Sequence, residues 1–386
     1  MKVVFTGGGT GGHFYPIIAV AEALQEIVTE RHLVAPQLYF MAPKPFDEES
    51  LFQHNIIFVK NRAGKMRRYF SLQNFTDLFV TVAGFVQAIM TLTKIYPDVV
   101  FSKGGYTSVP VVLAAWVLRI PIIIHESDSK PGRANLFAAK LAYRIGIAFE
   151  SSISYFPAKT RAKIAKVGIP VRREVARVDR EGAHQLLGLD PEVPTVLILG
   201  GSLGSQRINE TVLAGLPELV AFANVIHQTG KDNFEAMQRT APVVLKGSEH
   251  ADRYHAFPYL NAESMRRAAG AANVVISRAG ATSITEISLW HTPAILIPIP
   301  ENVSHDQRTN AYAYARTGAA VVLEEGNLAP HVLVSEARRL TLDTATAEAM
   351  VAASMTFATA DAARLIATEI VTIALTHEAP DNPLTA

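Results

Sequence analysis

Three glycine-rich segments follow short apolar runs and carry residue types suited to holding an anion. They are Gly7-Gly8-Gly9-Thr10-Gly11-Gly12-His13, Gly104-Gly105-Tyr106 and Gly200-Gly201-Ser202-Leu203-Gly204-Ser205. Glycines let the backbone turn tightly and approach a ligand, and the start of a following helix offers free N–H groups to an anion. We therefore expect phosphate-bearing ligands at these loops.

Several other site chemistries do not fit the sequence. The first loop matches the dinucleotide fingerprint, but the next predicted strand ends without the carboxylate that a ribose would need, and the first acidic residue is Asp47. No P-loop or G-x-S-x-G motif occurs, and His125-Glu126 lacks the second histidine of a zinc helix. The chain contains no cysteine and no D-x-D sequence, so we expect no thiol chemistry, no metal in the site and no cofactor.

The elements that must position these loops are predicted from alternating apolar runs and helical periodicity. Continuous apolar runs are typical of a parallel sheet buried on both faces. Helices are expected at 15–28 and 208–220, and strands at 2–6, 38–41, 56–59, 99–101, 122–125, 145–148, 195–199, 225–228, 274–277, 294–298 and 320–323. Both halves open with strand, glycine loop and helix, which predicts an α/β fold of two doubly wound, Rossmann-like domains.

Length and charge support two domains with different surroundings. The chain has 386 residues, which is longer than a single hydrophobic core usually supports. We therefore expect two domains, at 1–166 and 167–375, with a last helix that can pack back on the first domain. A disordered tail is expected at 376–386. Residues 1–170 carry 19 lysines and arginines against 11 acidic residues, and the remainder carries 17 against 24. The basic first half suggests an anionic partner. The uncharged apolar run at 78–93 is shorter than a bilayer span, which favours a soluble protein.

These segments together resemble the MurG family, the UDP-N-acetylglucosamine–N-acetylmuramyl-(pentapeptide) pyrophosphoryl-undecaprenol N-acetylglucosaminyltransferases. The shared motifs run in order through most of the chain. They are the first loop with Tyr15-Pro16, Gly104-Gly105-Tyr106, His125-Glu126, Pro131-Gly132, Gly168-x-Pro170-Val171-Arg172, Gly200-Gly201-Ser202-x-Gly204, Ser277-Arg278-Ala279-Gly280-Ala281 with Glu286, and His305-x-Gln307-x-x-Asn310.

The resemblance implies the GT-B architecture, with two domains facing a cleft, and a metal-independent, inverting reaction. N-acetylglucosamine (GlcNAc) would pass from UDP-GlcNAc to the C4 hydroxyl of undecaprenyl-diphospho-MurNAc-pentapeptide, called lipid I, giving lipid II in peptidoglycan synthesis. It also implies a peripheral protein at the cytoplasmic face of the bacterial plasma membrane and no nucleic-acid partner.

The resemblance assigns roles to individual residues. Glu286 would bind the ribose hydroxyls, Gln307 the GlcNAc hydroxyls, and His13 would be the general base, to which a pKa near 6.5 is suited. Residues that would contact the substrates, mainly at their diphosphate groups, are Thr10, Gly11, Gly12, Arg172, Ser202, Ala281, Thr282, Ser283, Ile284 and Thr285.

One position departs from the family pattern. The family usually has His-Glu-Gln-Asn where this chain has His125-Glu126-Ser127-Asp128, and the family's asparagine contacts the donor sugar. Ionised Asp128 accepts hydrogen bonds but does not donate them, so its expected sugar contact differs from the family's. We expect His125 and Glu126 to have a structural role, connecting the end of their strand to the cleft, and no part in catalysis.

Two other classes of function stay open at this stage. One is a different GT-B enzyme, such as a glycolipid glycosyltransferase acting on diacylglycerol or a UDP-GlcNAc 2-epimerase. The other is a non-catalytic sugar-nucleotide-binding scaffold at the membrane.

A basic cluster precedes an apolar helical stripe in the first domain. This pattern suits an anionic membrane surface, although part of the stripe is expected to pack inward. The cluster is Lys60, Arg62, Lys65, Arg67 and Arg68, and the stripe is Phe75, Leu78, Phe79, Val82, Phe85, Val86 and Ile89.

Overall fold

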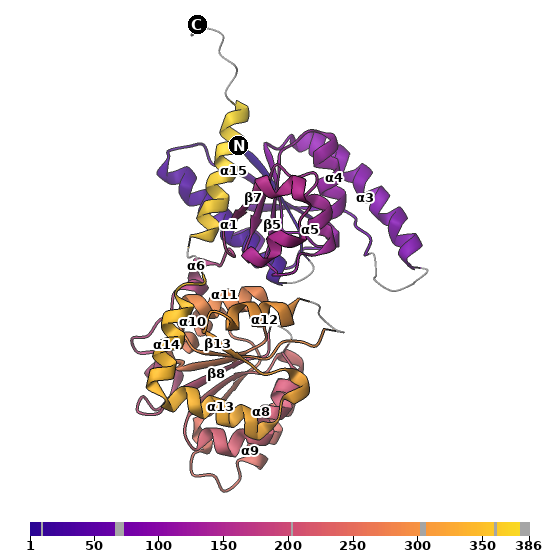
Figure 1. Cartoon of the computed structure of the whole chain (residues 1–386). Helices are drawn as coiled ribbons and strands as arrows, with labels where there is room; N and C mark the ends of the chain where they lie inside the picture. The colour runs from indigo at the N-terminus through magenta and orange to yellow at the C-terminus, as the bar shows by residue number, and fades with distance from the viewer. Residues whose placement is uncertain (9–10, 66–72, 202–203, 302–305, 359–360, 379–386) are drawn as a thin grey trace. The chain divides into compact units, whose positions relative to one another are not determined.

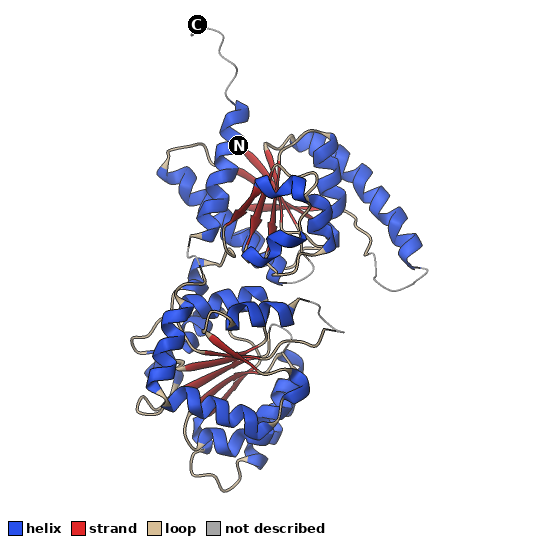
Figure 2. Ribbon diagram, viewed as in Figure 1, coloured by secondary structure: helices blue, strands red, loops and turns tan. Residues whose placement is uncertain are grey.

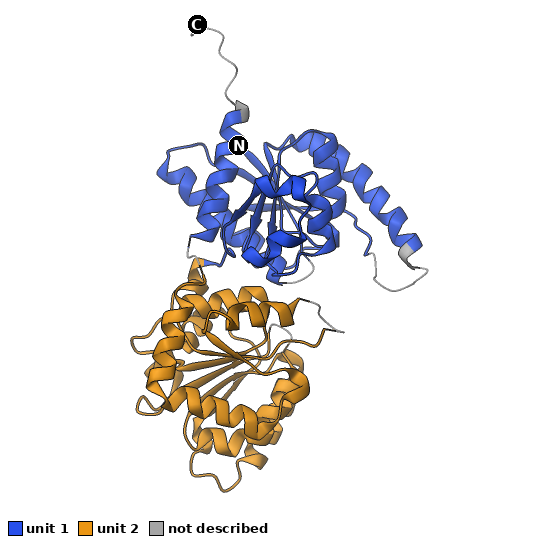
Figure 3. Cartoon of the chain, in the orientation of Figure 1, with its two compact units in different colours: residues 1–172, 359–386 blue, residues 173–358 orange. Residues whose placement is uncertain are grey.

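The computed structural model describes residues 1–8, 11–65, 73–201, 204–301, 306–358 and 361–378. Two compact units divide the chain (Figure 3): unit 1 comprises residues 1–172 and 359–386, and unit 2 residues 173–358. Figure 2 shows a sheet inside each unit with helices around it. The described strands pair in parallel throughout both sheets.

Unit 1 is built on a seven-stranded sheet of order β3-β2-β1-β4-β5-β6-β7 (Figure 1). Its strands are β1 (Lys2–Thr6), β2 (Gln37–Ala42), β3 (Ile56–Lys60), β4 (Val99–Ser102), β5 (Ile122–Glu126), β6 (Arg144–Ile147) and β7 (Ile164–Lys166). Its helices are α1 (Gly11–Glu30), α2 (Glu48–Gln53), α3 (Gln73–Ile95), α4 (Val109–Val117), α5 (Arg133–Ala138) and α15 (Ala362–Glu378), with 3₁₀ turns η1 (Tyr106–Ser108), η2 (Glu150–Tyr155) and η3 (Ala158–Lys163).

Apolar side chains cover both faces of the unit 1 sheet. On one face α1 packs with α15, where Ile17 and Leu24 share a cluster with Ile370 from the far end of the chain. On the other face Ala88 and Leu92 of α3 pack with residues of α4 and α5. The C-terminal helix therefore completes the core of the first unit.

Unit 2 is built on a six-stranded sheet of order β10-β9-β8-β11-β12-β13. Its strands are β8 (Thr195–Leu199), β9 (Asn224–Gln228), β10 (Tyr254–Phe257), β11 (Val274–Ser277), β12 (Ala294–Leu296) and β13 (Ala320–Val322). Its helices are α6 (Arg173–Ala176), α7 (Ala183–Leu187), α8 (Gln206–Val220), α9 (Lys231–Val244), α10 (Ala262–Ala271), α11 (Ala281–Trp290), α12 (Gln307–Ala315), α13 (Pro330–Leu342) and α14 (Thr344–Ser354), with 3₁₀ turns η4 (Ala251–Arg253) and η5 (Glu325–Asn327).

The two doubly wound sheets confirm the predicted fold class, and each of the predicted strands is present. β7 and β10 were not predicted. The division between units falls after Arg172 rather than after residue 166, because β7 extends the first sheet and His125 Nε2 bonds to the Gly168 carbonyl oxygen at 2.7 Å. The predicted tail begins inside a helix, since α15 continues through Glu378, and residues 379–386 lie outside the described part of the chain.

Candidate functional site

The predicted loops lie at the topological switch point of each sheet. In unit 1 the chain leaves β1 toward β2 and later leaves β4 toward β5, on opposite sides, so the carboxyl ends of β1 and β4 form the switch point, where open α/β sheets commonly bind ligands. The first loop follows β1, and Lys103-Gly104-Gly105 follows β4. In unit 2 the carboxyl ends of β8 and β11 are related in the same way.

The two glycine loops of unit 1 are packed together closely. A Cβ atom on Gly7 would lie 3.0 Å from the Cβ of Lys103, and one on Gly105 would lie 3.3 Å from the carbonyl oxygen of Gly8. Gly104 has φ +88°, and a Cβ there would meet the Asn135 side chain at 2.6 Å. Glycine is therefore required at Gly104 by both backbone conformation and space.

A buried charged network lies beneath these loops. Both oxygens of Glu126 accept hydrogen bonds: Oε1 from the N–H of Asp128 at 2.9 Å, and Oε2 from the N–H of Gly132 and the side-chain amide of Asn135, each at 3.0 Å. Burial raises the pKa of Glu126, while these bonds and Lys103 oppose that shift. Because both oxygens accept N–H donors, we assign the ionised form. Glu126 thus shapes the turn that carries Asp128.

Lys103 is the residue of this network that the sequence reasoning missed. Its side chain is 2% exposed, and its ammonium group donates a hydrogen bond to Ser127 Oγ. Burial lowers its pKa to about 8, against the opposing effect of Glu126 and Asp128. The signal was present in the sequence: a lysine directly follows a strand of four buried residues and precedes two glycines.

His13 stands at the third position of α1 and is half-buried. Burial lowers the pKa of His13 from 6.5 to about 4, and the positive charge of Lys103 makes a smaller contribution in the same direction. At neutral pH its imidazole is therefore uncharged and has a nitrogen lone pair that can accept a proton. Gly11 and Gly12 precede it in the first turn of α1, and Thr10 lies outside the described residues.

Arg172 is held against the same end of unit 1. Its guanidinium carbon lies 4.1 Å from the centre of the Tyr15 ring, a cation–π contact. The Tyr15 hydroxyl in turn donates to Asp47 Oδ2 at 3.5 Å, and Asp47 caps α2. The motif residue Tyr15 therefore orients Arg172 through its ring.

In unit 2 the first turn of α11 presents a polar face beside the switch point. Thr282, Ser283 and Glu286 are half-buried and share one side of the helix, because residues three and four apart are neighbours. Gly280 precedes the helix and provides no side-chain cap, and the N–H groups of Ala281, Thr282 and Ser283 have no partner within the helix.

The remaining predicted residues of α11 face inward. Ala281 and Ile284 are buried, and Thr285 is 2% exposed with its hydroxyl donating to the Ala281 carbonyl at 3.0 Å. The Ile284 N–H already donates to Gly280 at 3.0 Å. The structure therefore brings Thr282, Ser283 and Glu286 to the surface of α11 and leaves the side chains of its neighbours in the core.

Arg278 joins the separate loops of the unit 2 switch point. Its Nη2 donates to Ser205 Oγ at 2.6 Å, its Nη1 donates to the Ile297 carbonyl at 3.2 Å, and Nη1 lies 2.6 Å from Glu325 Oε2. Ser205 itself caps α8 by accepting from Ile208. The motif residue Arg278 thus links Ser205, at the start of α8, to the segments that follow β12 and β13. Ser202 lies outside the described part of the chain.

Gln307 begins α12, and its Oε1 accepts a hydrogen bond from the N–H of Ile299 at 3.2 Å. This hydrogen bond links the start of α12 to the segment that follows β12.

Among the described residues, no group of three or more histidine, aspartate and glutamate side chains is placed to hold a metal ion.

The outer face of α3 is an exposed apolar surface. Phe75 is 67% exposed and Phe79 is 61% exposed, and their rings meet edge to face at 5.0 Å. Leu78, Val82 and Val86 are also exposed. We call these five residues the α3 patch.

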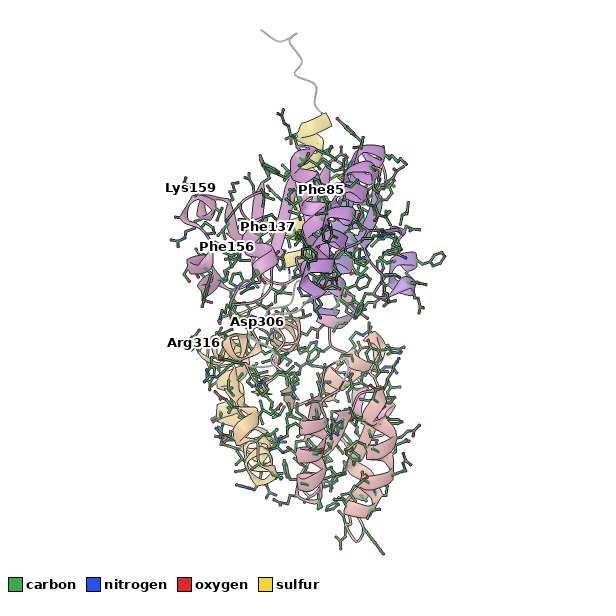
Figure 4. The ribbon with its side chains drawn as sticks, turned by 90° about the vertical axis from the view of Figure 1, so that its right-hand side faces the viewer. Phe85, Phe137, Phe156, Lys159, Asp306 and Arg316 are labelled. Carbon is green, nitrogen blue, oxygen red and sulfur yellow. The ribbon has the colours of Figure 1, made fainter. Side chains whose placement is uncertain are left out.

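Other residues of α3 face the body of unit 1. Ala88 and Leu92 are fully buried, and Ile89 packs against the core, as does Phe85, which is labelled in Figure 4. Of the basic cluster, Lys60, Arg62 and Lys65 are exposed, whereas Arg67 and Arg68 lie outside the described residues.

The helix that carries the α3 patch is longer than the uncharged run at 78–93. Residues Phe75–Ile95 form 21 residues of mean hydropathy 1.7, enough by length and composition to cross a bilayer. The helix is longer because it continues through Asp77 and Lys94. A single helix of this kind is weak ground for a membrane span, since helices packed on a protein core pass the same criterion.

Comparison with known proteins agrees with the geometry. Residues 3–147 match the glycosyltransferase family 28 N-terminal domain, and residues 195–366 match the C-terminal domain of the same family. A relative in Bacillus anthracis, named UDP-N-acetylglucosamine–N-acetylmuramyl-(pentapeptide) pyrophosphoryl-undecaprenol N-acetylglucosamine transferase 2, is 35% identical over 340 residues, 88% of this chain and 91% of the relative. A transferase of the same name without the numeral, from Treponema pallidum, is 37% identical over 334 residues, 86% of this chain and 85% of the relative.

Solved structures show the same architecture. The crystal structure of MurG from Acinetobacter baumannii matches with a TM-score of 0.73 and 25% identity, covering 96% of this chain and 99% of that one. A UDP complex of MnaA from S. aureus matches with a TM-score of 0.68 at 14% identity, covering 96% of both chains, which shows a common fold. The chain thus belongs to glycosyltransferase family 28, and within it to the MurG family of N-acetylglucosamine transferases.

Proposed function

We propose that this protein transfers GlcNAc from UDP-GlcNAc to the C4 hydroxyl of undecaprenyl-diphospho-MurNAc-pentapeptide, with inversion at the anomeric carbon. The observation that carries this proposal is the presence of glycine loops at the switch points of both sheets, in a chain that belongs to this transferase family. Each loop offers backbone N–H groups to a diphosphate.

The donor is assigned to unit 2. Glu286 accepts hydrogen bonds from the two ribose hydroxyls, because a carboxylate can take two neighbouring O–H groups. The uncapped N–H groups at the start of α11, with the loop that contains Ser202, stabilise the charge that develops on the departing UDP. The oxygen of Gln307 is used within its loop, so its amide nitrogen is the group assigned to the GlcNAc hydroxyls.

Unit 1 supplies the base and the acceptor loop. The acceptor O4 attacks C1 of GlcNAc as the bond from C1 to the β-phosphate oxygen breaks, and a His13 nitrogen takes the proton from O4. His13 begins uncharged, as this step requires. A pKa near 4 makes it a weak base, but a nearby acceptor diphosphate would favour its charged form and raise that pKa.

Four further residues keep their sequence-based roles in this proposal. Thr10, Gly11 and Gly12 contact the donor and acceptor diphosphates. Arg172 contacts diphosphate oxygens, for which its contact with Tyr15 orients it.

The α3 patch supports binding at a membrane surface, where a lipid-linked acceptor would be found. Exposed apolar rings beside Lys60, Arg62 and Lys65 combine insertion with attraction to anionic lipid. The inner face of α3 is fixed in the core of unit 1, so we propose that the helix lies on the membrane rather than crossing it. The resemblance favours the cytoplasmic face of the bacterial plasma membrane.

The reaction is tested with labelled UDP-GlcNAc and two acceptors, a lipid I analogue and its 4-deoxy derivative. We expect a disaccharide product, with the new sugar β-linked at C4, from the first acceptor and none from the second. Transfer to diacylglycerol, or formation of UDP-N-acetylmannosamine without acceptor, would support the glycolipid or epimerase alternatives instead.

A further inference from the structure

Gln228, the last residue of β9, carries a buried amide to which the proposed function gives no role. β9 lies between β10 and β8 in the unit 2 sheet, and Gln228 is aligned with the last residues of these neighbours, Phe257 and Leu199. The residue is 3% exposed. A polar side chain is therefore enclosed at the edge of the sheet where the segments after β8 and β10 begin.

The amide of Gln228 bonds to both of those segments. Its Nε2 donates a hydrogen bond to the Gly201 carbonyl oxygen at 3.1 Å, and its Oε1 accepts one from the Leu260 N–H at 3.0 Å. The two partners fix the orientation of the amide, because a carbonyl oxygen requires a donor and an N–H requires an acceptor. Gln228 therefore bridges the unit 2 glycine loop, residues 200–205, to the segment that follows β10.

Two glycines of the unit 2 glycine loop are held in different ways. Gly204 is held by packing, since it has φ +76° and a Cβ there would lie 2.2 Å from the Thr229 carbonyl oxygen. Gly201 has φ +87°, and a Cβ there would meet nothing within 4 Å. Its carbonyl oxygen instead accepts hydrogen bonds from the Gly204 N–H, at 3.0 Å, and from Gln228. Gln228 thus restrains Gly201 from outside the loop.

This restraint bears on ligand binding more than on stability. A buried hydrogen bond adds little net stability, because the same groups bond to water in the unfolded chain. A glycine backbone, however, has more conformations to lose than any other when a ligand orders it. Holding the Gly201 carbonyl in the folded protein removes part of that cost before a ligand arrives. An apolar side chain of similar volume would fill the same space without this effect.

We propose that Gln228 is a positioning residue for the donor: by holding the Gly201 carbonyl, its side-chain amide sets the unit 2 glycine loop in place before the UDP diphosphate binds. The inference rests on the proposed function, which assigns that diphosphate to the loop containing Ser202. The effect of Gln228 should therefore appear in the affinity for UDP and be absent from the affinity for uridine, which carries no phosphate.

The first measurement needs no ligand. Hydrogen–deuterium exchange of full-length wild type and Gln228→Met is followed by mass spectrometry in peptides that contain residues 200–205. Gln228→Met removes both hydrogen bonds without adding a charge, so exchange in this loop should be faster. The matched control is Asn224→Leu, at the amino end of the same strand, where buried Asn224 donates to the carbonyl oxygens of Asp190 and Val193. Loop exchange in this control should equal that of wild type.

The second measurement compares the affinities of the same proteins for UDP and for uridine by calorimetry, with a thermal melt to show that each variant is folded. Gln228→Met should bind UDP about 5- to 10-fold more weakly, the equivalent of one hydrogen bond, and should bind uridine as wild type does. Asn224→Leu should keep both affinities. Gln228→Asn, whose shorter side chain cannot reach both partners, gives the same comparison if Gln228→Met does not fold.

Three results would overturn the inference: loop exchange equal to wild type, unchanged affinity for UDP, or equal losses of affinity for UDP and uridine. Failure of the proposed function is recognised separately, because wild type itself would then not bind UDP. The exchange measurement still decides in that case whether Gln228 holds the unit 2 glycine loop.

Discussion

The α3 patch gives a quantitative prediction for membrane binding. Phe75 and Phe79 are 67% and 61% exposed, so together they present slightly more than one whole phenylalanine side chain to the surroundings. Full burial of such a side chain contributes about 1.5–3 kcal/mol, so inserting both rings should contribute about 2–4 kcal/mol. Replacing both by serine should weaken binding to anionic vesicles about 30- to 700-fold.

Co-sedimentation with vesicles measures this loss, and two controls separate insertion from folding. Phe52 on α2 is 84% exposed and outside the α3 patch, so Phe52→Ser should leave vesicle binding unchanged. Leu92 is fully buried on the inner face of α3, so Leu92→Ala should lower the free energy of unfolding by about 2–5 kcal/mol without changing the binding of folded protein. If the double-serine variant binds vesicles as tightly as wild type, the α3 patch does not insert into membranes, and the reasoning is refuted.

Three further predictions concern the two sites and the core. Glu286→Ala should weaken UDP-GlcNAc binding by about 1.5–3 kcal/mol in calorimetry, the scale of hydrogen bonds to a charged group, and unchanged affinity would remove the ribose assignment. His13→Ala should lower kcat about 100-fold or more with little change in donor affinity, and near-normal turnover would mean that another group takes the proton. Burial lowers the pKa of His227, bonded to Asn209 and Tyr254, to about 3, so below pH 6.5 the unfolded chain binds a proton that the folded chain does not. The free energy of unfolding, measured in urea, should fall as the pH falls from about 6.5 toward 3, and His227→Gln should flatten that dependence; equal slopes would contradict it.

Most strands of the two sheets could be predicted from the sequence, because they are continuous apolar runs between glycine loops and helices. β10 was missed since its four residues, including His255, are only half-buried at the sheet edge. β7 was missed because two of its three residues are exposed. Edge strands have one neighbour and need less apolar character, so periodicity alone is a weak signal for them.

The site was predicted less completely, because motifs identify residues while packing decides which atoms they present. Ile284 and Thr285 share a motif with Glu286, yet the helical period directs their side chains into the core and that of Glu286 toward the surface. The sequence places Lys103 between a buried strand and two glycines, but this placement does not show what the side chain contacts. Its importance follows from strand order, which makes β4 the neighbour of β1 and so brings the lysine under the first glycine loop.

The central claim is tested most directly by UDP release from UDP-GlcNAc, followed continuously with and without a lipid I analogue in mixed micelles. The account predicts that release depends on the acceptor, that one disaccharide product forms for each UDP released, and that Glu286→Ala and His13→Ala both reduce the rate. UDP release at the same rate without acceptor, or no release with it by a folded protein that binds UDP-GlcNAc, would contradict the assignment of this protein as the transferase.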